Sequence, residues 1–92
     1  MQKNNRIIIV TIKNCESCLI VKNIINSIVS NRNLPIDVII KDKEDCTKTF
    51  LKENKIEDFP TCIFYKNDIK VFKTTGNYPS IVFIQWIYRF LI

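Results

Sequence analysis

The sequence predicts a single α/β domain over residues 1–92. Two observations support this prediction. Apolar, β-branched runs typical of buried strands alternate with segments whose apolar residues recur at helical spacing. In chain order these elements give the pattern β-α-β-α-β-β-α, in which helices pack against a sheet. The 92 residues, of which 47% are apolar and 25% charged, are enough for one modest hydrophobic core.

The first strand and the first helix are predicted in the N-terminal third of the chain. RIIIVTIK at 6–13 is almost continuously β-branched, which indicates a strand buried on both faces. From Cys18 to Val29 the apolar residues return every three or four positions, with polar residues between them, which predicts a helix. The polar stretch NRNLP at 31–35 should end this helix.

A second strand and a second helix are predicted next. IDVII at 36–40 should be a second buried strand, joined to the first by a right-handed parallel crossover. A helix is expected from about residue 44 to 54, with Asp42 or Asp45 as its N-cap. Its inner face should be formed by Cys46, Phe50 and Leu51.

The third and fourth strands are predicted to form a hairpin. TCIFY at 61–65 and IKVFK at 69–73 are both typical of strands, and Lys66, Asn67 and Asp68 separate them. Asn and Asp tolerate the left-handed conformations that a tight turn needs. The two strands should therefore be antiparallel neighbours.

The last predicted helix, over residues 79–92, is apolar almost all round. Pro79 lies near its first turn, and Ser80, Gln85 and Arg89 are its only polar residues after that proline. A helix that covers one side of a sheet needs only an apolar stripe, so part of this surface should be exposed in a monomer. We predict a homodimer or a protein partner at residues 79–92. The alternative is a deeply packed helix with frayed apolar ends.

Charge and composition narrow the classes of partner. The net charge of +5 comes from 14 basic and nine acidic residues that are spread along the chain. A nucleic-acid interface would need a one-sided basic stripe, so no nucleic-acid partner is expected, and nucleic-acid binding by a basic surface is kept as a third, weaker alternative. No segment is long enough for a transmembrane helix and no secretory signal is visible, so no membrane association is expected either. We expect a reducing compartment, namely the cytoplasm. The chain has no Ala and one Gly but many Ile, Lys and Asn residues, which indicates AT-rich coding. If this bias reflects a large DNA virus, the compartment would be the host cytoplasm.

The sequence CESC places Cys15 and Cys18 three residues apart, where the first strand gives way to the first helix. Cys15 is expected at the helix N-terminus and Cys18 one turn inside, which is close enough for a disulfide. The unpaired amides of a helix N-terminus favour a thiolate and lower the pKa of a cysteine there from about 8.5. Cys15 is therefore predicted to be the attacking nucleophile of thiol–disulfide exchange, and Cys18 the resolving thiol.

The neighbours of Cys15 should adjust its reactivity in opposite directions. The carboxylate of Glu16 disfavours a thiolate beside it, whereas Lys13 would favour one. We therefore expect a moderate reductant or exchanger and not a strong oxidant.

The stretch DFPTC at 58–62 is a second signal. A proline at the start of a strand would be unusual in a central strand. It makes sense if the Phe59–Pro60 bond is cis and lies opposite the cysteines, because the backbone of Phe59 is then available to pair with a substrate strand.

Two other uses of the cysteine pair remain open, namely a structural disulfide and half of a zinc site. Exchange chemistry is favoured over a structural disulfide by the helix-start position of Cys15 and by Pro60. A zinc site would need more ligands, but Cys46 and Cys62 form no second CxxC and the chain has no His. The absence of His also excludes Cys–His catalysis. Cys62 is expected in the core and Cys46 to be partly buried.

CESC after the first strand, FPT before the third, the YKND hairpin and the later Gly76 resemble the thioredoxin/glutaredoxin family over essentially the whole chain. The resemblance implies a four-stranded mixed sheet flanked by three helices and thiol–disulfide oxidoreductase activity. By position, Cys15 matches the nucleophile, Cys18 the resolving cysteine and Pro60 the cis-proline. The substrate site is predicted at Lys13, Phe59, Pro60 and Thr61.

The chain departs from both branches of this family. Asn14 and Ile9 stand where thioredoxins usually have a Trp and a buried acid. Glu16-Ser17 replaces the Pro-aromatic pair of glutaredoxins, and TTGNYPS lacks their Gly-Gly motif, although the short length is closer to a glutaredoxin. The expected redox group is the Cys15–Cys18 disulfide, with no bound cofactor and with glutathione as a further candidate. The expected partner is a protein disulfide or dithiol, or glutathione. The alternative is a non-catalytic interaction module that uses its C-terminal helix.

Overall fold

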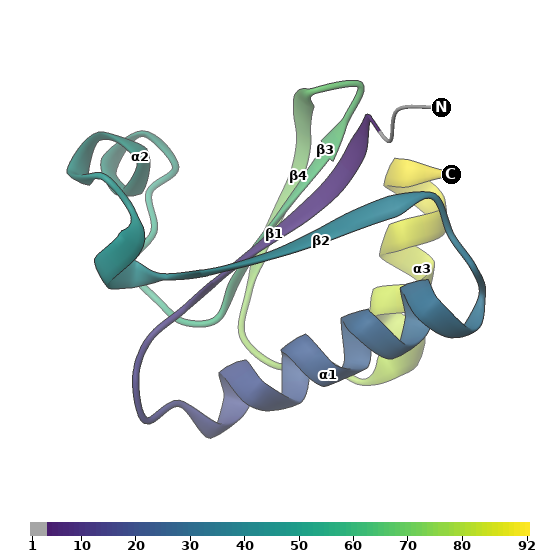
Figure 1. Ribbon diagram of the computed structural model, residues 1–92, viewed down its shortest axis with the longest axis horizontal. Helices are drawn as coiled ribbons and strands as arrows, with labels where there is room; N and C mark the ends of the chain where they lie inside the picture. Colours follow the sequence, from purple (N-terminus) through teal and green to yellow (C-terminus); the bar gives the residue numbers. More distant parts are fainter. Residues whose placement is uncertain (1–3) are drawn as a thin grey trace.

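A four-stranded mixed sheet with three helices forms the structure, which is a computed structural model that describes residues 4–92 (Figure 1). The predicted order β-α-β-α-β-β-α is confirmed, with one short 3₁₀ helix in addition. The elements in chain order are β1 Asn5–Thr11, α1 Glu16–Asn31, β2 Ile36–Asp42, the 3₁₀ helix Lys43–Asp45, α2 Lys48–Glu53, β3 Thr61–Lys66, β4 Ile69–Thr75 and α3 Ser80–Leu91.

The strand order β2-β1-β3-β4 places β1 in the middle of the sheet. β1 pairs in parallel with β2 and antiparallel with β3, and β3 pairs antiparallel with β4. The residues Ile7 to Val10 are all buried, so the prediction of a strand covered on both faces is confirmed for β1. The same prediction for 36–40 is wrong. Only Ile36 is buried there, because β2 has one neighbouring strand and lies at the sheet edge.

The sheet separates two apolar clusters. Ile7 and Ile9 of β1 face one side, where α1 and α3 pack, and Ile8 and Val10 face the other side, where α2 packs. This division follows from the two-residue period of a strand. Figure 1 shows α1 and α3 near each other and α2 apart from both. The larger cluster consists of Ile7, Ile9, Val21, Ile25, Ile28, Ile36, Cys62, Phe64, Phe83, Ile87 and Leu91.

The segment predicted as one helix over 44–54 is divided in two. The side chain of Asp42 accepts a hydrogen bond from the N–H of Glu44 at 2.9 Å and caps the 3₁₀ helix. Cys46 is extended, and Thr47 then caps α2 by accepting from the N–H of Phe50 at 3.0 Å. Asp42 is thus a cap as predicted, but of the 3₁₀ helix. The prediction of Asp45 as a cap is wrong because Thr47 provides the cap of α2.

The hairpin prediction is confirmed. Asn67 and Asp68 have φ angles of 52° and 66°, the left-handed values that their short polar side chains tolerate. The turn is tied to β1, since the N–H of Asn67 donates to the Asn5 side chain at 3.1 Å and Arg6 forms an ion pair with Asp68.

Helix α3 buries one face and exposes another. Phe83, Ile87 and Leu91 point into the core, whereas Ile81, Tyr88 and Ile92 are exposed. The expectation that part of this apolar helix lies at the surface is confirmed, and an interface there stays a prediction. Among residues 4–92, no helix has the length and apolar character needed to cross a membrane.

Candidate active site

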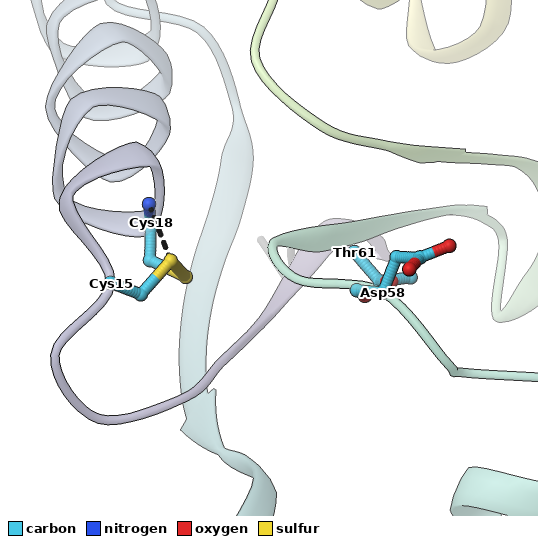
Figure 2. The surroundings of a disulfide bond; sticks show 4 residues. All are labelled: Cys15, Cys18, Asp58 and Thr61. Atoms are coloured by element: carbon cyan, nitrogen blue, oxygen red, sulfur yellow. Dashed lines mark hydrogen bonds between the residues drawn. A yellow bond between two sulfur atoms is a disulfide. The ribbon is translucent and has the colours of Figure 1, made fainter.

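Cys15 lies where the loop after β1 turns into α1. Asn14, directly before it, has a φ of 58° in the left-handed region, and Cys15 itself is extended and serves as the N-cap of α1. Its Sγ accepts a hydrogen bond from the backbone N–H of Cys18 at 3.1 Å (Figure 2). The sulfur therefore takes the place that a Ser, Thr or Asp oxygen usually has at a helix start.

Cys15 and Cys18 are joined by a disulfide, with their Cα atoms 5.2 Å apart. The two cysteines differ in exposure. Cys18 is only 4% exposed, on the inner side of α1, whereas Cys15 is partly exposed. An incoming sulfur therefore reaches Cys15 and not Cys18, and the sulfur that it would attack lies at the N-terminus of α1, where the Cys18 amide donates to it.

The segment 58–61 lies at the same end of the sheet as the disulfide. Thr61, the first residue of β3, pairs with Val10 near the end of β1, and the disulfide follows one short loop later. The Phe59–Pro60 peptide bond is cis. Figure 2 shows Asp58 and Thr61 in the surroundings of the disulfide.

Hydrogen bonds hold this segment at both ends. The hydroxyl of Thr61 donates to the carbonyl of Asp58 at 2.6 Å, and the N–H of Gly76 donates to the carbonyl of Pro60 at 2.9 Å. Pro60 and Thr61 are buried, while Phe59 is partly exposed. The geometry thus brings Phe59, Pro60 and Thr61 to the end of the sheet that carries the cysteines.

Lys13 forms an ion pair with a residue of the 3₁₀ helix. Its Nζ lies 3.3 Å from a carboxylate oxygen of Glu44, and both side chains are exposed. Together with Cys46, Lys13 lines a depression of about 420 Å³ between the β1–α1 loop and the start of α2. The charge predicted to act on Cys15 is therefore shared with a carboxylate of the 3₁₀ helix.

The other two cysteines are poor candidates for a nucleophile. Burial raises the pKa of the Cys62 thiol to about 12, so the thiol stays neutral in the core. Burial also raises the pKa of Cys46, with Lys41 opposing that shift, and its Sγ donates to the carbonyl of Asp42 at 3.5 Å. Cys62 in the core and Cys46 partly buried are both as predicted. Among residues 4–92, no three His, Cys, Asp or Glu side chains gather as metal ligands would.

A second depression, of about 230 Å³, opens beside the disulfide on the β2 side, and the sequence analysis missed it. Leu19 was the available signal, since it is apolar but lies outside the buried stripe of α1 formed by Cys18, Val21, Ile25 and Ile28. We call this depression the β2-side depression. It is lined by Thr11, Ile12, Asn14, Cys15, Cys18, Leu19, Lys22 and Ile40.

Comparison with solved structures identifies the fold. An oxidised thioredoxin O2 from Arabidopsis thaliana superposes with a TM-score of 0.77 at 15% identity, covering 95% of this chain and 75% of that one. A Fasciola hepatica thioredoxin gives 0.78 at 12% identity, with 97% and 83% covered. A chain from structures of the thiol-resolving mechanism of yeast mitochondrial 1-Cys peroxiredoxin via the glutathione and thioredoxin systems gives 0.77 at 13% identity, with 94% and 78% covered.

Sequence comparison adds no relative, because no family model and no curated protein sequence matches the chain. The fold is nevertheless the thioredoxin-like fold, as the resemblance implied, with the CxxC pair oxidised at the start of α1.

Proposed function

We propose that this chain is a thiol–disulfide oxidoreductase that uses Cys15 and Cys18 as a dithiol. The observation that supports this most directly is the Cys15–Cys18 disulfide, placed at the N-terminus of α1 with one partly exposed sulfur, in a thioredoxin-like fold. A purely structural role is less favoured, because a bridge between residues three apart closes a short loop and constrains the unfolded chain less than a bridge between distant residues would.

The reaction has two exchange steps. In the first, the Cys15 thiolate attacks one sulfur of a substrate disulfide, forms a mixed disulfide and releases the other substrate sulfur as a thiolate. In the second, the Cys18 thiolate attacks the Cys15 sulfur, restores the Cys15–Cys18 bond and releases the remaining substrate thiolate. Two electrons pass from the dithiol to the substrate, and the reverse direction follows when the partner has the lower reduction potential.

The start of α1 favours Cys15 as the attacking group. The N–H of Cys18 points at the Cys15 sulfur, and a donor aimed at sulfur binds a thiolate more strongly than a neutral thiol. Cys18 is covered, so it reacts with the neighbouring Cys15 sulfur and not with solvent thiols.

The segment with Phe59, Pro60 and Thr61 is the proposed backbone-binding part of the substrate site. Within residues 4–92, no hydrogen bond engages the backbone N–H or C=O of Phe59, whereas the Pro60 carbonyl is occupied by Gly76. An extended substrate segment can pair with the free groups of Phe59 as an added strand would. Lys13 is proposed to attract anionic substrates and to share its charge with Glu44 in their absence.

Both a protein and glutathione are candidate partners for this cycle, and no bound cofactor is needed beyond the disulfide itself. A cycle that starts from the dithiol suits a reducing compartment such as the cytoplasm.

The test uses three serine variants of the reduced protein and a disulfide-linked peptide dimer as substrate. Cys15→Ser should abolish exchange, and Cys18→Ser should accumulate a covalent mixed disulfide at Cys15 that mass spectrometry detects. Cys46→Ser is the matched control and should exchange at the wild-type rate, since its thiol is outside the cycle. Activity of Cys15→Ser equal to wild type would exclude this mechanism.

The exposed side of α3 favours a second candidate function, that of an interaction module without turnover. Ile81, Tyr88 and Ile92 are apolar, exposed and spaced to share one helix face, a pattern found at interfaces between copies of a chain. We propose a second copy of the chain as the occupant. Sedimentation should then show a dimer that Ile81→Asp dissociates. A wild-type monomer, or a dimer unaffected by this change, would contradict the proposal.

A further inference from the structure

The β2-side depression lies against the reactive sulfur, on the side of the disulfide away from Pro60. β1 separates the two sides, because β3 with Pro60 at its start pairs with one edge of β1, and β2 pairs with the other. Cys15 and Cys18 form one wall of the depression. A molecule joined to the Cys15 sulfur can therefore extend toward Phe59 or into this depression.

Three aliphatic side chains around the depression are open to solvent. Ile12 is 39% exposed, Leu19 54% and Ile40 40%. Ile40 stands opposite Ile9 in the parallel register, so it points to the same face of the sheet as α1, but it lies on the edge strand and keeps 40% of its surface exposed. The three residues come from the β1–α1 loop, from α1 and from β2, and together they give the depression an apolar rim.

The one charged residue that lines the β2-side depression, among those that the structure describes, is basic. Lys22 lies one helical turn after Leu19 and lines the depression, which has no carboxylate in its lining. Lys22 also forms no ion pair within residues 4–92, unlike Lys13, which has Glu44. An acidic group on a bound molecule would thus meet a cation without a competing partner.

This combination fits a polypeptide better than it fits glutathione. Glutathione has carboxylates but no apolar side chain, so it would leave the aliphatic rim open to water. A polypeptide with an aliphatic residue next to its cysteine would bury apolar surface there, and an acidic neighbour would reach Lys22.

We propose that the β2-side depression is a specificity subsite for protein substrates, and that it binds a segment with an aliphatic residue and an acidic residue beside the disulfide-bonded cysteine. This inference rests on the proposed oxidoreductase function and names the substrate class of the same site.

The chemistry needs no further reactant. Each turnover oxidises the Cys15–Cys18 dithiol to the disulfide and reduces one substrate disulfide to two thiols. The subsite contributes only binding, which holds the substrate sulfur near Cys15.

The experiment measures single-turnover oxidation of fully reduced wild-type protein by three substrates. The first is a disulfide-linked homodimer of a short peptide with the core Asp-Cys-Leu, the second is the same dimer with the core Ser-Cys-Ser, and the third is oxidised glutathione. Burial of a leucine side chain and one ion pair should make the first substrate react about tenfold faster than the second and the third.

Surface variants then assign the preference to the depression. Leu19→Ser and Ile40→Ser should each reduce the Asp-Cys-Leu advantage by roughly threefold and leave the Ser-Cys-Ser rate unchanged. A Ser-Cys-Leu dimer differs from the Asp-Cys-Leu dimer only in lacking the acidic residue. Lys22→Gln should reduce the rate advantage of the Asp-Cys-Leu dimer over the Ser-Cys-Leu dimer. The control is Ile69→Ser, an exposed aliphatic residue on β4 outside the depression, which should change none of these rates. These sites are exposed or partly exposed, so the variants should fold, and circular dichroism should give the wild-type spectrum for each.

The outcomes separate the two proposals. If the wild type reacts with all three substrates at equal rates, or if Leu19→Ser and Ile40→Ser keep the full preference, the subsite is excluded while the oxidoreductase function stands. If no disulfide oxidises the reduced protein, the proposed function fails and the subsite fails with it.

Discussion

The backbone N–H of Cys18 donates to the Sγ of Cys15 at 3.1 Å, so one hydrogen bond both caps α1 and holds the exposed sulfur of the pair. The spacing of the CxxC motif is what allows this, because the amide three residues after an N-cap is one of those left without a partner inside the helix. The position that starts the helix is therefore also the position that favours a thiolate. Fold and candidate chemistry depend on the same two residues.

The four thiols of the reduced protein should be alkylated in a fixed order. Cys15 is partly exposed, and its sulfur accepts a hydrogen bond from the Cys18 N–H. Burial raises the pKa of the Cys46 thiol and raises the pKa of the Cys62 thiol to about 12. Near neutral pH, iodoacetamide should modify Cys15 at least about tenfold faster than Cys46, with Cys62 untouched until the protein unfolds. Peptide mass spectrometry over time measures the order. Cys46 reacting before Cys15 would contradict the assignment of the nucleophile.

The Cys62 thiol should make the protein less stable at alkaline pH. Its pKa is about 12 in the fold against an ordinary value of 9.0, so between these values the unfolded chain loses a proton that the folded chain keeps. The contribution of Cys62 to stability is thus complete below pH 9 and falls as the pH rises toward 12. The slope should be about 1.4 kcal/mol of unfolding free energy per pH unit. Urea denaturation across this range, with dithiothreitol present, measures it.

The matched control for this linkage is Cys62→Ala. Below pH 9 it should be less stable than wild type by a constant amount, because the truncation leaves a small cavity in the core. Above that pH the two stability curves should converge, since only the wild type loses the Cys62 contribution. Parallel curves up to pH 12 would show that the thiol does not titrate differently in the two states.

Local patterns were enough for most of the fold. The burial of β1 follows from its unbroken β-branched run, and the hairpin follows from Asn67 and Asp68, whose left-handed φ angles few other residues adopt cheaply. Each of these features depends on residues that are close in the chain. Sequence periodicity therefore predicts them without knowledge of which strands become neighbours.

Two features of the fold depend on information that the sequence pattern lacks. Residues 36–40 look like a buried strand, but β2 lies at the sheet edge, and strand order arises from pairings between distant segments. The helix predicted from residue 44 is interrupted because Asp42 and Thr47 both act as N-caps only a few residues apart. Either side chain is a good cap on its own, so composition does not decide between one helix and two.

The candidate site was predicted unevenly for the same reason. The spacing of Cys15 and Cys18 sufficed to place both at the start of α1. Two other features of the site involve residues that are far apart in the chain. Lys13 forms an ion pair with Glu44, and Leu19 and Ile40 line the same depression. Neither could be predicted before β2 was placed beside β1.

Lys73 should stabilise the end of α2 although it lies on β4. Its ammonium donates to the carbonyl of Asn54 at 2.9 Å and to that of Lys55 at 3.1 Å, just after the last turn of the helix. These carbonyls lack helical partners, and a cation there also complements the helix dipole. Lys73→Met keeps most of the stem but removes the charge and the donors, so it should cost about 1–2 kcal/mol of unfolding free energy in urea.

Lys70→Met is the control for this contact. Lys70 also lies on β4, but it is exposed, and among residues 4–92 its ammonium donates only to the side chain of Asn54, at 3.0 Å. Because a solvated surface contact of this kind contributes little, the change should cost less than about 0.5 kcal/mol. Hydrogen exchange gives a second readout, in which amides of α2 lose protection in Lys73→Met while those of α1 keep it. Equal effects of the two substitutions would mean that the backbone contacts of Lys73 do not anchor α2. The packing of α2 on Ile8 and Val10 would then be enough to hold the helix in place.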